Sequence, residues 1–181
     1  MKVRISTAPR FKHLLCQSAI AGVAVLLHAQ AWAQAAPPYG PSVTQAMAEK
    51  AVNCAVAFAR EKQWRIALAV VDTHGFLVHY TKMDDTQTSG PAIALEKAKT
   101  AAMFRRPSRV FEDGLAKRPA YLGLPGATPV IGGMPILVDG QVIGGMGGSG
   151  AASDEDEQAV IAGLRVFSKT AAQTAGTADC K

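Results

Sequence analysis

The chain has 181 residues, of which 49% are hydrophobic, and its 19 Lys and Arg outnumber its 14 Asp and Glu. Four of the basic residues and none of the acidic ones lie in the first 33 positions, so the remainder carries 15 basic and 14 acidic residues and is nearly neutral. Such a balance lacks the positive charge with which proteins bind nucleic acid, and we exclude nucleic acid as a partner. The remaining residues, roughly 150, suit a single domain with its own core.

The N-terminus has the layout of a secretory signal. Its basic residues precede an apolar stretch from Leu14 to Ala29, and Ala31-Trp32-Ala33 offers a small-x-small cleavage site, with Ala33-Gln34-Ala35 as an alternative. The apolar stretch is shorter than the roughly 20 residues that span a bilayer, so we expect no membrane span after cleavage. We predict a cleaved signal peptide over 1–33, a linker over 34–41 and one domain over 42–175, in a periplasmic or secreted protein.

The first half of the domain predicts a helix, a hairpin and a second helix. Ser42 is a candidate N-cap for a helix that reaches Lys62. Two β-rich runs, 66–72 and 76–83, flank a turn at Asp72-Thr73-His74-Gly75. An alanine-rich helix follows over 89–104.

The second half predicts a short helix over 108–116, a long loop over 117–128 and a hairpin on Asp139-Gly140. The second strand of this hairpin is expected to run into a glycine-rich loop at 144–150, and Ser153 is expected to cap a last helix that reaches about Thr170. Because no βαβ spacing occurs, a dinucleotide site is disfavoured. The order of elements predicts an α+β domain: an antiparallel sheet of about five strands with helices packed on it.

Several motifs together resemble the GlcG/HbpS family, also called DUF336. They are Val70-Val71-Asp72 with Gly75, Leu77 and Val78; Ala94, Lys97, Ala98, Thr100 and Ala101; Gly132-Gly133 with Pro135 and Ile136; and Gly148-Ser149-Gly150. One departure is Lys82, where the family pattern has Arg, so a bidentate grip on a carboxylate is lost there.

The resemblance implies a profilin-like fold, homo-oligomers such as octamers, and haem binding in exported members. It implies an exported haem-binding protein that acts in haem sequestration or redox-linked sensing. The alternative is a small-metabolite (organic acid) binding protein, or an accessory enzyme, with its site at the glycine-rich loop. No catalytic spacing of Ser, His and Asp or of paired carboxylates is recognisable, so a binding role is favoured over an enzymatic one, and the question of activity stays open.

If haem is the cofactor, its iron needs an axial ligand and its propionates need cations. The domain has two histidines, His74 in the turn and His79 on the following strand, and both are candidate iron ligands or surface imidazoles. Met83 is a candidate thioether ligand whose default role is to fill the core. Lys97 and Arg105 are candidate partners of the propionates or solvated surface charges. By alternation, His79 should share a face of its strand with Leu77 and Thr81.

Two further groups have structural explanations beside functional ones. Cys54 and Cys180 are candidates for a disulfide, because an exported chain meets an oxidising compartment; Cys54 alone would be a buried thiol. The acidic run of Asp154, Glu155 and Asp156 either complements the dipole of the last helix or ligates a metal.

Overall fold

The computed structural model describes residues 35–168 and Cys180, so the predicted signal peptide lies outside the described residues. Within them, no helix is long and apolar enough to cross a membrane. The α-helices are α2 (Gln45–Glu61), α3 (Gly90–Phe104), α4 (Arg109–Gly114) and α5 (Ser153–Leu164). The strands are β1 (Ala67–Val71), β2 (Leu77–Lys82), β3 (Gly133–Val138) and β4 (Gln141–Ser149), and two 3-10 helices cover Pro119–Gly123 and Arg165–Phe167.

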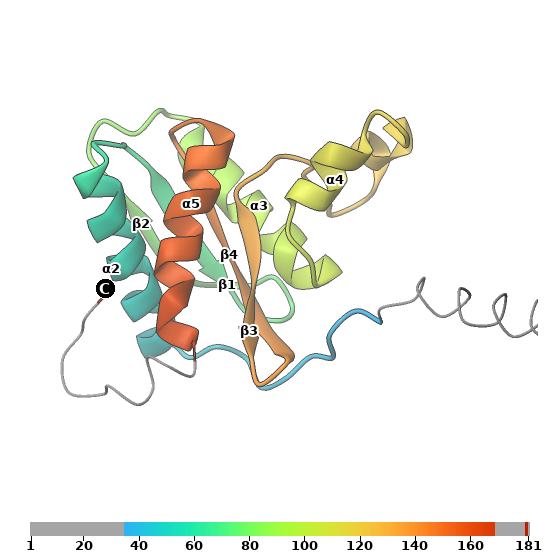
Figure 1. The fold of residues 1–181 in the computed structure, drawn as a ribbon, viewed down its shortest axis with the longest axis horizontal. Coiled ribbons are helices and arrows are strands. Elements are labelled where there is room, and N and C mark those ends of the chain that lie inside the picture. Colours follow the sequence, from blue (N-terminus) through green and yellow to red (C-terminus); the bar gives the residue numbers. More distant parts are fainter. Residues whose placement is uncertain (1–34, 169–179, 181) are drawn as a thin grey trace, which may run out of the picture. The chain divides into compact units, whose positions relative to one another are not determined.

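One antiparallel sheet in the order β2-β1-β4-β3 forms the middle of the domain. Helices α2 and α5 lie side by side on one of its faces, and α3 lies on the other (Figure 1). The larger part of the core lies between the sheet and the α2–α5 pair, and a smaller alanine-rich part lies under α3. The predicted α+β single domain is therefore confirmed, with four strands in the described part of the chain.

Three local predictions are wrong. Thr44, and not Ser42, caps α2, because its Oγ1 accepts the N–H of Met47 at 3.3 Å. The last helix is preceded by Ala152 at its N-cap position and gives way to a 3-10 turn after Leu164. The expected glycine-rich loop does not exist, because β4 continues without a break to Ser149 and pairs with β1 and β3 over this length.

The glycines of β4 are required by the helix that covers them. A Cβ atom placed on Gly145 would lie 2.3 Å from the carbonyl oxygen of Ala98, and one on Gly147 would lie 2.2 Å from that of Ala94. These are distances that no carbon–oxygen contact tolerates, so α3 lies with its backbone directly on the strand. Alanines on the facing side of α3 allow the same close approach from above.

Gly147→Ala is expected to lower the free energy of unfolding by about 3 kcal/mol, because backbone atoms cannot move aside as a flexible side chain would. Gly123→Ala is the matched control, since nothing lies within 4 Å of a Cβ at that position; it should change stability by less than about 0.5 kcal/mol. Urea denaturation measures both. Equal stability of the two variants would contradict the direct helix-on-strand contact.

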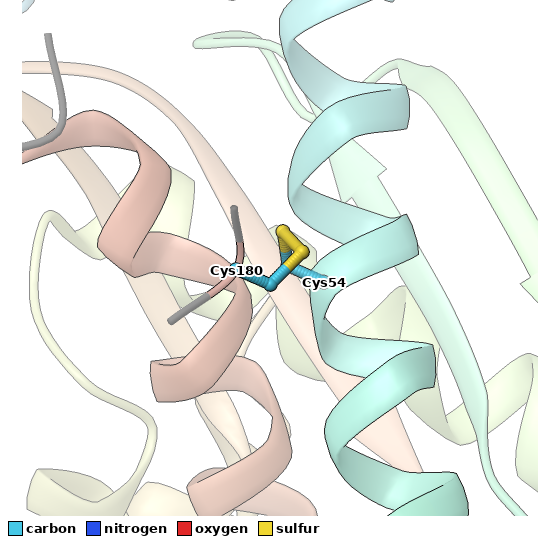
Figure 2. Close-up of a disulfide and its surroundings, with 2 residues drawn as sticks. All are labelled: Cys54 and Cys180. Atoms are coloured by element: carbon cyan, nitrogen blue, oxygen red, sulfur yellow. A yellow bond between two sulfur atoms is a disulfide. The ribbon is translucent and has the colours of Figure 1, made fainter. Parts of the chain in front are cut away.

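A disulfide joins α2 to the penultimate residue of the chain (Figure 2). Cys54 and Cys180 are 126 residues apart, with an S–S distance of 2.05 Å and a Cα–Cα distance of 5.1 Å. Cys54 itself is buried on α2. A bridge that closes so long a loop restricts the unfolded chain strongly, and such bridges stabilise proteins by about 2–4 kcal/mol.

Cys180→Ser should therefore lower the free energy of unfolding by about 2–4 kcal/mol. Position 180 is chosen because Ser at buried position 54 would also disturb the packing of α2. A thiol reductant should bring the wild-type protein down to the stability of the variant and leave the variant unchanged. An equal loss in both proteins on reduction would show that the bridge is not the source of the difference.

Candidate functional site

The turn between β1 and β2 holds His74 in a defined position. Asp72 Oδ1 accepts the backbone N–H groups of His74 at 2.8 Å and of Phe76 at 2.9 Å, the hydrogen bonding by which Asp stabilises turns. Gly75 completes the turn with φ of 87°, a conformation that side chains disfavour. The imidazole is exposed, and its Nδ1 lies 3.2 Å from Thr73 Oγ1. This is the one hydrogen bond of the imidazole among the described contacts.

The C-terminal end of α3 lies against this turn. A Cβ placed on Gly75 would be 3.4 Å from the sulfur of Met103 and 3.6 Å from Cγ of Lys99. Met103 is 45% exposed and Phe76 is 72% exposed, so both present apolar surface beside His74. The turn therefore places an imidazole, a thioether and an aromatic ring at one end of the domain.

The segment 37–42 runs along the same end and adds a ring and a cation. The hydroxyl of Tyr39 donates to the carbonyl oxygens of Ala102 at 3.1 Å and Met103 at 2.8 Å. Arg105 Nη1 donates to Pro37 O at 3.1 Å, and the guanidinium carbon lies 5.2 Å from the centre of the Tyr39 ring. A further contact joins the segment to the turn, since Ser42 Oγ lies 3.0 Å from Thr73 Oγ1.

We call this group of partly or fully exposed residues the turn surface: Tyr39, His74, Phe76, Met103 and Arg105. Sequence reasoning selected His74 and Arg105 as candidate ligand residues and did not single out Met103. It missed Tyr39 and Phe76, because nothing in their local pattern brings the N-terminal segment to the hairpin turn. The turn surface combines two candidate iron ligands, the imidazole of His74 and the thioether of Met103, with apolar area and the positive charge of Arg105.

The other two candidate iron ligands lie elsewhere. His79 is half-buried on β2 and pairs with Val70, whereas Leu77 pairs with Val71. Because neighbouring residues of β1 point to opposite faces, His79 and Leu77 also lie on opposite faces, and the predicted shared face is wrong for Leu77. The cause is a register shift between Val70 and Val71, a bulge that the sequence does not signal. Thr81 pairs with Leu68 and does share the face of His79, as predicted. Met83 is 8% exposed and belongs to the core beneath α2.

Lys97 is the largest fully buried side chain of the domain as described, at 1% exposure. Its Nζ donates to Asp156 Oδ2 at 2.9 Å and to Gly148 O at 3.0 Å. A Cβ on Gly132 would lie 2.9 Å from this ammonium, so the missing side chain at 132 makes room for it. The ion pair joins α3 to α5, two helices on opposite faces of the sheet.

Burial raises the pKa of Asp156 above its ordinary value, although the charge of Lys97 and the backbone N–H of Ala151 act in the opposite direction. The carboxylate therefore depends on its partner: without the lysine charge, the backbone N–H of Ala151 is left as the opponent of the desolvation. Removing one member of a buried pair is more damaging than replacing both.

The acidic run at the start of α5 is engaged within the protein. Arg109 on α4 contacts both Asp154 and Glu157, the latter at 2.6 Å between Nη2 and Oε2. Glu155 accepts the N–H of Ala152 at 3.1 Å. Each acid thus has a structural partner, and the described residues contain no cluster of three or more His, Cys, Asp or Glu arranged for a metal ion.

A shallow cavity of about 260 Å³ lies at the other edge of the sheet, beside β3 and the end of α5. Its lining is Pro135, Leu137, Leu164, Phe167 and Ser168. Ligand sites combine apolar walls with polar groups that orient the ligand. This lining offers neither an iron ligand of the imidazole kind nor a cation, in contrast to the turn surface.

Fold and site together define a small α+β domain that carries ligand-type side chains on an exposed turn, outside a glycine- and alanine-rich core. Residues 43–165 match the family model described as "Haem degrading protein HbpS-like", and the chain belongs to this family. It is 35% identical to Protein GlcG of Escherichia coli K12 over 106 residues, which cover 58% of this chain and 79% of GlcG.

Two solved structures share the fold. The crystal structure of HbpS superposes with a TM-score of 0.68 at 30% identity and covers 71% of this chain and 92% of that one. The crystal structure of a PduOC:haem complex superposes with a TM-score of 0.63 at 21% identity and covers 68% and 94%. The second likeness concerns the fold alone.

Lys97→Met should lower the free energy of unfolding by about 3–5 kcal/mol near pH 7, because it leaves the Asp156 carboxylate buried without its cation. The pKa of Asp156 then lies still further above its unfolded value, so the folded variant binds the extra proton and loses stability as pH rises from about 4 towards neutrality. The gap between variant and wild type should therefore narrow at low pH.

The double variant Lys97→Met, Asp156→Leu is the control, since it removes both charges. It should recover most of the loss and show no such pH dependence. Urea denaturation at several pH values measures all three proteins. A gap that stays constant with pH would contradict a buried carboxylate as its cause.

Proposed function

We propose that this protein is an exported haem-binding protein of the HbpS type, which acts in haem sequestration or redox-linked sensing and binds haem at the turn surface. The observation that carries the proposal is the exposed side chain of His74, which stands on a turn whose backbone Asp72 holds and shares the turn surface with apolar and cationic side chains. Binding is the step that sequestration, sensing and degradation of haem share, and it is therefore the property to test first.

The turn surface offers the chemistry that each part of a haem molecule needs. The side chain of His74 is exposed, and a neutral imidazole can ligate iron through Nε2. Phe76 and Tyr39 offer apolar and aromatic area to the porphyrin, and the guanidinium of Arg105 can pair with a propionate. Lys97 is left out of this proposal, because its ammonium is buried against Asp156.

The comparisons support haem as the kind of ligand to propose. The family description names haem, and one solved relative of the same fold is a haem complex. A surface of exposed side chains covers one face of a flat porphyrin, so we propose that a second copy of the chain covers the other face in a homo-oligomer. Export follows from the predicted signal peptide and is part of the same proposal.

The metabolite hypothesis needs a site at the glycine-rich loop, and the structure has a strand where that loop is expected. The residues expected in an open glycine-rich loop lie in β4, where 142–149 are buried under α3 and α5. An organic acid would have to bind elsewhere on the domain, and no arrangement of described residues favours a particular place.

Haemin titration of the purified mature protein tests the proposal. Wild type should give a saturable, shifted Soret band, and His74→Ala should shift the band and weaken binding about tenfold or more, because it removes the proposed axial ligand. His79→Ala is the matched control, a histidine on the neighbouring strand outside the turn surface, and should bind within about twofold of wild type. Arg105→Ala should weaken binding without moving the band.

Two results would overturn the proposal in different ways. No saturable band in wild type would reject haem as the ligand and turn attention to small organic acids. A band that responds to His79→Ala and not to His74→Ala would keep haem but reject the turn surface as its site.

A further inference from the structure

Met103 lies between two loops that are far apart in the sequence. Its sulfur would be 3.4 Å from a Cβ on Gly75 in the β1–β2 turn, and its methyl carbon would be 3.5 Å from a Cβ on Gly126 in the long loop after α4. Both glycines have positive φ, 87° and 77°. The thioether thus fills the space that two glycine turns leave at the end of α3.

The position of the Met103 backbone is fixed independently of its side chain. Its carbonyl oxygen accepts the hydroxyl of Tyr39 at 2.8 Å, and the helix ends directly behind it, with Arg105 in the left-handed region at φ of 55°. A change in the volume of the side chain is therefore passed on to the turns that it touches and less to the helix.

Met103 also has the largest exposed fraction among the methionines of the described residues, 45%. Met83 and Met146 are buried, at 8% and 0%. Met47 on α2 is exposed to a similar degree, at 37%. Access decides which thioethers react with a dissolved oxidant, so Met103 and Met47 are the reactive pair and differ in what they touch.

We propose that Met103 is an oxidation site that regulates the turn surface. Hydrogen peroxide is the oxidant: the sulfur lone pair attacks one peroxide oxygen, the O–O bond breaks, an S–O bond forms, and water leaves, so that the sulfide gains one oxygen atom and loses two electrons. The sulfoxide is larger, polar and reducible by methionine sulfoxide reductases. Its oxygen is added to the sulfur that packs beside Gly75, and we expect the bulkier, polar group to displace the turn that carries His74.

The proposed regulation of haem binding rests on the proposed function, whereas the movement of the turn does not. The sulfoxide shifts the population of turn conformations away from the one in which Asp72 fixes His74. The expected coupling between oxidation and haem binding lies in the ordinary range of such effects, at about fivefold or more in the dissociation constant.

The experiment compares wild type, Met103→Leu and Met47→Leu before and after treatment with hydrogen peroxide. Leu keeps the apolar volume and cannot be oxidised. Peptide mass spectrometry measures the sulfoxide at each position, NMR of the imidazole signals reports on His74, and haemin titration reports on the site. A methionine sulfoxide reductase then tests reversal.

In wild type and in Met47→Leu, we expect peroxide to oxidise Met103, to shift the His74 signals and to weaken haemin binding about fivefold or more. In Met103→Leu, we expect peroxide to change neither the His74 signals nor haemin binding. Unchanged His74 signals in fully oxidised wild type, or an equal response of Met103→Leu, would overturn the inference even if haem binds. If untreated wild type binds no haemin, the proposed function fails, and the NMR comparison still decides whether Met103 controls the turn.

Discussion

Helix α3 lies with its backbone directly on the glycines of β4, and the positions of the remaining elements depend on this contact. Side chains normally separate a helix from the sheet that it covers, but here the carbonyl oxygens of Ala98 and Ala94 lie within 2.3 Å of where a Cβ on Gly145 or Gly147 would be. Gly133 on the neighbouring strand makes the same approach to Lys97 O, at 2.2 Å. Strands β3 and β4 therefore form one flat surface under α3. Backbone atoms set the position of α3 along this surface, and they are less adaptable than side chains.

This fixed register has consequences in the middle of α3 and at its C-terminal end. In its middle, Lys97 comes to lie over Gly132, where its side chain reaches Asp156 on the helix of the opposite layer. At its C-terminal end, Met103 comes to lie against the β1–β2 turn, and the last carbonyl oxygens receive the hydroxyl of Tyr39. The buried ion pair and the exposed turn surface are thus two results of the same placement. A sequence change that moved the helix would disturb both, although they share no side chain.

The class of fold could be predicted from the sequence, because the periodicity of hydrophobic residues indicates helices and strands, and Asp and Gly at the turns indicate hairpins. The path of β4 could not be predicted, because glycines occur both in loops and in strands that a helix covers closely. Only the presence of α3 shows that these glycines belong to a strand. The burial of Lys97 escaped for a related reason: its position on the helix is polar in pattern, and the gap that admits it is made by Gly132, remote in sequence. Alternation does not reveal the bulge in β2, so it places Leu77 wrongly on the face that His79 and Thr81 share. His74 was easier, since a turn residue is exposed whatever the rest of the chain does.

The distribution of glycine and alanine explains why the ligand chemistry of this domain lies at its end and not on its sheet. Glycine and alanine bring no functional groups, and a helix packed on backbone atoms leaves no space for a ligand. The centre of the domain therefore tolerates few substitutions and offers no ligand-binding chemistry. Imidazole, thioether, aromatic ring and guanidinium come from segments whose conformation is set by local hydrogen bonds, as Asp72 sets that of His74. The two sulfur-containing features are divided in the same way: the Cys54–Cys180 bridge stabilises the layer of α2, whereas Met103 borders the turn. Reductants and oxidants should therefore act on different properties of this protein, the first on its stability and the second on its exposed surface.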